Sequence, residues 1–111
     1  MFNKSNRVEE KANTLMDNCN SLAKKVMVCA EMVYVRNLCR GVYFTDHDVN
    51  LAEQEINASK RRLKAAMEDY AKAVNTYNDY LNTFPRQLYN FPEMPSPHDL
   101  VAKSIKKVLD K

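Results

Sequence analysis

The segment from Tyr70 to Pro85 reads YAKAVNTYNDYLNTFP and carries the clearest structural pattern in the chain. Its large apolar residues return every three or four positions, which is the period of one face of an α-helix. They are Tyr70, Val74, Tyr77, Leu81 and Phe84. Proline removes a backbone donor and clashes with the preceding turn, so Pro85 stops the pattern. The stretch therefore predicts the last turns of a long amphipathic helix.

The same register continues upstream and predicts a helix from about 46 to 83. Its earlier apolar positions are Val49, Ile56, Leu63 and Met67. Glu53 and Lys60 interrupt this stripe, and the small residues Ala52 and Ser59 lie beside them, where another helix could approach. Thr45 and Asp48 form a capping-box pattern, which predicts the start of the helix.

A second long helix is predicted from about 5 to 40. Ser5 or Asn6 could cap it, with Glu9 completing a capping box, and Gly41 suits the position just after a helix end. Its stripe alternates steps of four and three, as in a coiled coil. The members are Val8, Ala12, Leu15, Cys19, Leu22, Val26, Cys29 and Val33.

The last part of the chain combines a proline-rich segment with a short helix. All four prolines fall between Pro85 and Pro97, so we expect residues 85–96 to be extended. Ser96 as cap and Pro97 at the first helical position predict a third helix over about 97–110.

These elements predict an all-α fold in one domain, residues 1–111: a long antiparallel helical hairpin plus a short C-terminal helix. Because a two-helix rod leaves apolar surface uncovered, we expect dimerisation to complete a four-helix-type bundle, with the third helix packed in cis or in trans. The predicted core comprises Val8, Leu15, Leu22, Val26, Val33, Ile56, Leu63, Met67, Tyr70, Val74, Tyr77, Leu81 and Phe84.

Composition limits the class of partner and the cellular compartment that we expect for the protein. The formal charge of +3 is too small to indicate a dedicated nucleic-acid binder. Cys19, Cys29 and Cys39 are ten residues apart along one predicted helix, about 15 Å per step, which is too far for a disulfide within the chain. With no apolar run long enough to span a membrane and no secretion signal, we expect a soluble, cytoplasmic protein.

The titratable residues do not suggest an enzyme. They are scattered along rods, so we expect no catalytic residues, no cofactor and no small-molecule substrate. His47 between Asp46 and Asp48 could contact one ion, but helix capping accounts for most of the same residues, and we expect no metal. The cysteines lie on or near the apolar stripe and are better explained as small buried hydrophobes than as nucleophiles.

Several residues outside the predicted core are candidates for partner binding. One group is apolar or aromatic and the other is the densest basic cluster of the chain. They are Met27, Met32, Tyr34, Val35, Tyr80, Leu88, Tyr89 and Phe91, and Lys60, Arg61, Arg62 and Lys64. A solvated helix face is the ordinary explanation of the basic cluster, whereas phosphate or an acidic partner is the functional one.

The spacing of Tyr70, Val74, Tyr77-Asn78, Leu81 and Phe84-Pro85 resembles the C-terminal helix signature of the LemA family. The segment from Phe2 to Glu10 is similar to the one that follows the membrane anchor in that family. The chain lacks that anchor and part of the middle helices, and it has Tyr70-Ala71 where the family has tyrosine-asparagine. The resemblance implies an antiparallel helical bundle and, through some members, a link to membrane remodelling or organelle assembly. It also implies a membrane-associated location if the chain is a LemA-like fragment trimmed of its anchor.

We therefore expect a non-enzymatic helical scaffold or adaptor that acts through protein association, as a homo-oligomer and with a protein partner. One alternative is a small accessory protein that binds nucleic acid or phosphate through Lys60, Arg61, Arg62 and Lys64. Another is weak contact with a membrane surface through the last helix, where Lys103, Lys106 and Lys107 flank an apolar face.

Overall fold

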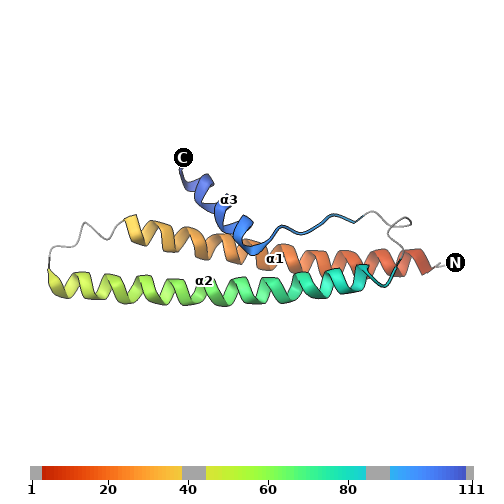
Figure 1. Cartoon of the computed structure of the whole chain (residues 1–111), viewed down its shortest axis with the longest axis horizontal. Helices are drawn as coiled ribbons and strands as arrows, with labels where there is room; N and C mark the ends of the chain where they lie inside the picture. The colour runs from red at the N-terminus through yellow and green to blue at the C-terminus, as the bar shows by residue number, and fades with distance from the viewer. Residues whose placement is uncertain (1–3, 39–44, 85–90, 110–111) are drawn as a thin grey trace.

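The computed structural model describes residues 4–38, 45–84 and 91–109. It contains α1 (Lys4–Leu38), α2 (Asp46–Leu81) and α3 (Pro97–Leu109), and all secondary structure in the described residues is helical. The two long helices run side by side in opposite directions, and α3 crosses α1 and leaves the rod at an angle (Figure 1). The molecule measures 69 × 25 × 21 Å. The predicted all-α class is confirmed.

All three helices start within one residue of the predicted positions, and two of the three predicted caps agree with the structure. Thr45 has extended backbone and its hydroxyl accepts a hydrogen bond of 3.0 Å from the Asp48 N–H, so it caps α2. Ser96 caps α3 in the same way, with its hydroxyl 3.1 Å from the Asp99 N–H. However, α1 already begins at Lys4, so Ser5 and Asn6 lie inside the helix and the predicted cap is wrong.

The ends of the long helices come slightly earlier than predicted. Helix α1 ends at Leu38 rather than near 40, and Gly41 lies outside the described residues. Helix α2 ends at Leu81, after which the Asn82 N–H donates to the Asn78 carbonyl as the helix closes. Helix α3 packs mainly against α1 of the same chain.

The seam between α1 and α2 combines a column of large residues with a column of small ones. On α2 the large residues recur every seven positions, and so do the small ones. The large column is Ile56, Leu63, Tyr70 and Tyr77, and Phe84 continues it beyond the end of the helix; the small column is Ala52, Ser59, Ala66 and Ala73. All four small residues are buried, so Ala52 and Ser59 are seam positions that face α1. Small side chains at a repeated seam position allow two helix backbones to approach closely.

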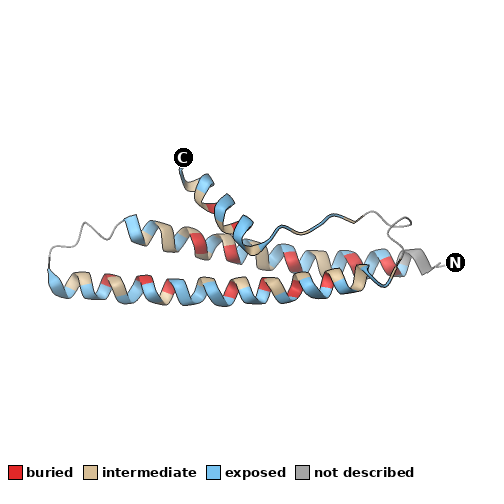
Figure 2. Ribbon diagram, viewed as in Figure 1, coloured by how far each residue is buried: buried red, intermediate tan, exposed pale blue. Residues whose placement is uncertain are grey.

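Burial is uneven along the rod. Buried positions recur on both long helices (Figure 2), but the main cluster lies where α3 and the segment before it add a third layer. It contains Cys19, Val26, Ala66, Tyr70, Ala73, Tyr77 and Leu100. In the described part of the chain, no helix is apolar enough over a sufficient length to cross a bilayer.

Candidate functional site

Two buried tyrosines hold the segment before α3 against the hairpin. Tyr70 and Tyr77 are both 0% exposed. The Tyr70 hydroxyl donates to the Pro95 carbonyl at 2.6 Å, and the Tyr77 hydroxyl donates to the Pro92 carbonyl at 2.9 Å. An extended segment has no internal backbone partners, so such ties satisfy polar groups that burial would otherwise leave unpaired. We call residues 91–96 the strap.

The same environment keeps these groups neutral. Burial raises the pKa of the Tyr70 and Tyr77 phenols above their usual value, and the nearby Cys19 adds to the rise. Burial also raises the pKa of the Cys19 thiol, and a backbone hydrogen bond opposes it. A thiolate is the nucleophilic form of cysteine, so Cys19 is a packing residue rather than a reactive one.

Apolar packing and a side-chain hydrogen bond both hold helix α3 on α1. Leu100 is buried in the main cluster. Ser104 is also buried, and its hydroxyl donates to the Met27 carbonyl at 2.7 Å. Because this carbonyl belongs to α1, the bond sets the position of α3 along the rod.

Arg36 joins the two long helices near the connection between them. Its guanidinium donates to the buried Ser59 hydroxyl and, at 3.3 Å, to the Glu55 carbonyl. An arginine therefore occupies the place where the apolar stripe of α1 stops, and it pairs with a small polar residue across the seam.

A continuous apolar face is left exposed on the C-terminal third of α1. Val28, Met32, Val35 and Leu38 are exposed, with 56% of Val28 and 64% of Leu38 accessible. Their spacing of four and three places the first three on one side of the helix, away from α2. We call these four residues the loop-end face. Leu51, exposed on α2, lies at the same end of the rod.

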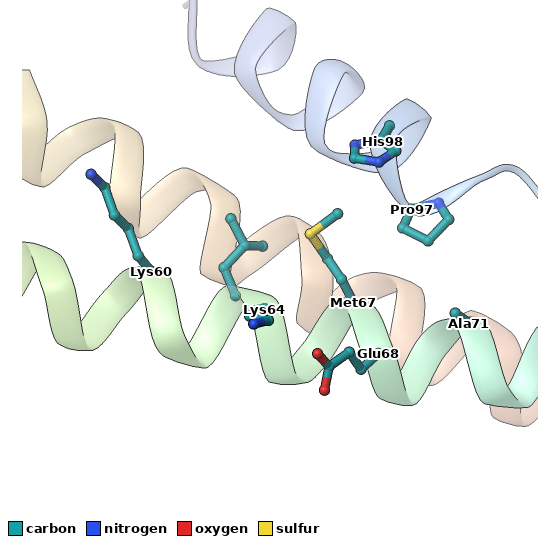
Figure 3. A pocket seen from close by; sticks show the side chains of 8 residues that line it. Lys60, Lys64, Met67, Glu68, Ala71, Pro97 and His98 are labelled. Atoms are coloured by element: carbon teal, nitrogen blue, oxygen red, sulfur yellow. The ribbon is translucent and has the colours of Figure 1, made fainter.

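The basic cluster of α2 is divided between different sides of the helix. All four side chains are exposed, but only Lys60 and Lys64 line a groove with α3. Its volume is about 350 Å³. The groove lies beside the first turn of α3 (Figure 3) and is lined by Lys60, Leu63, Lys64, Met67, Glu68, Ala71, Pro97 and His98.

Some residues that we predicted for partner binding make internal contacts instead. The Tyr80 hydroxyl donates to the Val8 carbonyl at 3.3 Å, and its ring packs edge-on against Phe84 at 5.1 Å. The Lys11 ammonium lies 4.9 Å from the centre of the same ring, a cation–π distance. Tyr80 is therefore half-buried and held by contacts within the chain, and its role in partner binding stays a prediction.

Phe91 and Met27 are half-buried and pack against the main cluster, so only part of each side chain is open to a partner. Tyr34 is half-buried, whereas Met32 and Val35 are exposed. Leu88, Tyr89 and Cys39 lie outside the described residues.

The predicted core residues are buried to different extents. Val8, Val26, Ile56, Tyr70 and Tyr77 are buried. The others are half-buried at the edges of the seam: Leu15, Leu22, Val33, Leu63, Met67, Val74, Leu81 and Phe84. The prediction missed the buried Ala30 of α1 and the buried Ala66 and Ala73 of α2. For the two on α2, the seven-residue spacing of small residues was the available signal.

Side chains with metal-binding chemistry do not converge in the described ranges 4–38, 45–84 and 91–109, where no three His, Cys, Asp or Glu residues could hold one ion. His47 is exposed at the start of α2. Two surfaces of the described residues, the loop-end face and the groove at α3, have been identified above from exposure and from lining residues. The sequence matches no protein-family model, and neither a curated protein nor a solved structure matches it.

Proposed function

We propose that this chain is a non-enzymatic helical scaffold that acts by protein association through the loop-end face. The observation that carries the proposal is the exposure of Val28, Met32, Val35 and Leu38 on one stretch of α1, which neither α2 nor α3 covers. Contiguous exposed apolar surface is characteristic of a binding surface. A heptad-like spacing suits another helix, whose side chains would pack between these residues.

The first partner that we propose is a second copy of the chain. Two loop-end faces in antiparallel contact would place α1 against α1 and bring four long helices together at that end. A protein partner with an amphipathic helix could use the same surface in the same way. A LemA-like role in a membrane-linked process stays a prediction that rests on the segments Phe2–Glu10 and Tyr70–Pro85.

Light scattering of the purified chain at low and at physiological salt tests this proposal. We expect a dimer whose mass does not change with salt, because apolar contacts are not screened by ions. Met32→Glu together with Val35→Glu should produce monomers, since each change places a charge in the contact. Asn18→Glu is the matched control, because Asn18 is exposed elsewhere on α1.

Circular dichroism should show the same helix content in all three proteins. A wild-type chain that stays monomeric at every concentration would contradict self-association. Dimers that persist in the Met32→Glu, Val35→Glu protein would show that association uses another surface.

The alternative function, polyanion binding through Lys60, Arg61, Arg62 and Lys64, is favoured by one observation, the exposure of all four side chains. It predicts affinity for a single-stranded oligonucleotide that falls steeply between low and physiological salt. The division of the cluster around the helix argues for few simultaneous phosphate contacts, and so for weak binding.

A further inference from the structure

The groove beside α3 combines an apolar floor with positive charge at its edge. Leu63, Met67 and Ala71 of α2 and Pro97 of α3 supply the apolar surface. Figure 3 shows Met67 reaching from α2 toward the first turn of α3, where Pro97 and His98 lie. The groove exists because α3 packs mainly on α1 and leaves this side of α2 uncovered.

The charged residues of the groove are arranged asymmetrically. Lys60 and Lys64 lie one helical turn apart on α2, and both are exposed. Glu68 is the acidic residue among the lining residues, and in Figure 3 it points away from α3. Toward α3, the groove therefore has an apolar floor of Leu63, Met67 and Pro97, and Lys60 and Lys64 place positive charge at its edge.

We propose that this groove binds a single-chain anionic amphiphile of the fatty-acid class. The alkyl chain would lie on Leu63, Met67 and Pro97, and the acid head would lie between Lys60 and Lys64. Charge complementarity selects an acid over a neutral or cationic head. The groove volume, about 350 Å³, is at the lower end of the range for small-molecule sites, about 300–1,000 Å³, which fits one chain.

A membrane surface is a poorer fit to the same residues. A bilayer contacts flat or convex faces of a helix, such as the exposed Lys103, Lys106 and Lys107 of α3. The groove instead lies at the concave junction of two elements. We therefore assign it to the free amphiphile, as a site separate from the loop-end face.

Calorimetric titration of the full chain with sodium dodecanoate, below the concentration at which it forms micelles, tests the site. We expect one dodecanoate per chain, with dodecanol and dodecyltrimethylammonium binding at least about tenfold more weakly. Lys60→Glu with Lys64→Glu should lower the affinity for dodecanoate about tenfold. The change removes two exposed ion pairs, and each such pair raises the affinity by roughly threefold. The same protein should bind dodecanol as the wild type does.

Two further variants separate the groove from the rest of the molecule. Ala71→Phe should fill the groove and abolish binding of both dodecanoate and dodecanol. Lys72→Glu, with Lys72 exposed on α2 outside the groove, carries the charge change of one of the two rim substitutions and should bind like the wild type. Far-UV circular dichroism checks that each protein keeps its helices with ligand present.

Three results would overturn the proposal. One is equal affinity for all three amphiphiles, or many bound per chain, which indicates adsorption. Another is wild-type dodecanoate affinity in the Lys60→Glu, Lys64→Glu protein. The third is binding to vesicles that contain anionic lipid without any binding of free dodecanoate. Repeating the titration on the Met32→Glu, Val35→Glu protein separates this site from the proposed function, because the loop-end face is then lost while the groove is intact.

Discussion

At the scale of single residues, Tyr77 combines two separable contributions to stability, the burial of its ring and the hydrogen bond to the Pro92 carbonyl. We expect Tyr77→Ala to lower the free energy of unfolding by about 3–5 kcal/mol, the range for removing a large buried aromatic ring. Tyr77→Phe keeps the ring and should cost about 0.5–1.5 kcal/mol, the net value of one hydrogen bond.

Urea unfolding followed by circular dichroism measures both changes. Tyr34→Phe is the control, because Tyr34 is only half-buried on α1. An unchanged stability of Tyr77→Ala would show that the ring is not part of the core.

The raised pKa values of Tyr70, Tyr77 and Cys19 predict sensitivity to alkali. In the unfolded chain these groups lose protons near their ordinary pKa values, about 8.5 for cysteine and 10 for tyrosine, whereas the folded chain holds the protons to higher pH. The unfolded state therefore binds fewer protons in this interval, and stability falls as pH rises.

We expect the free energy of unfolding to decline from roughly pH 8 upward, where the unfolded thiol begins to ionise. Denaturation curves at a series of pH values measure the decline. In Tyr70→Phe with Tyr77→Phe the alkaline fall should be smaller than in the wild type. A fall of the same size in both proteins would assign it to other groups.

At the scale of elements, the small column of α2 sets how closely α1 and α2 approach. Ala66 is 2% exposed and faces the seam, whereas the adjacent Ala65 is exposed. Ala66→Leu should cost about 1–3 kcal/mol because the packed seam has no space for the added carbons. Ala65→Leu should change stability by less than about 0.5 kcal/mol.

Thermal unfolding of both variants makes the comparison, since helix propensity changes equally in the two. If Ala66→Leu is tolerated as well as Ala65→Leu, the helices do not pack closely at this column.

The elements also show which features the sequence could predict. Thr45 and Ser96 cap α2 and α3 as expected because a cap bonds within its own first turn, so its pattern is local. The small seam positions Ala30 and Ala66 were missed because periodicity was traced through large residues. The ties from Tyr70 and Tyr77 to the strap join residues 25 and 15 positions apart, and no local pattern encodes such a pair.

The candidate sites also include some features that the sequence could predict and others that it could not. Exposure of Met32 and Val35 followed from their places off the main stripe of α1. The contacts of Tyr80 with Val8 and Lys11 could not be predicted, because they depend on how far α2 slides along α1. The groove at α3 also depends on tertiary packing, since it exists only where α3 meets α2.

At the scale of the whole molecule, the elongated shape gives a direct prediction. The Cα radius of gyration is 18.9 Å, whereas a compact domain of this length would have about 13 Å. Because the loop-end face occupies one end of the rod, an antiparallel pair would overlap only there and extend well beyond 69 Å. Small-angle X-ray scattering should then show a dimer much longer than the monomer. A dimer of nearly the monomer's length would instead indicate pairing along the whole rod.

The few ties that hold the strap and α3 have a mechanical consequence. If the molecule is pulled by its carboxyl end, the load reaches the hairpin through the contacts of the strap and α3, which include the phenols of Tyr70 and Tyr77, the hydroxyl of Ser104 and the apolar contact of Leu100. These contacts are loaded one after another along the tail, before the longer seam between α1 and α2. A force–extension trace should therefore show a small early step, as the tail peels off, before the long helices part.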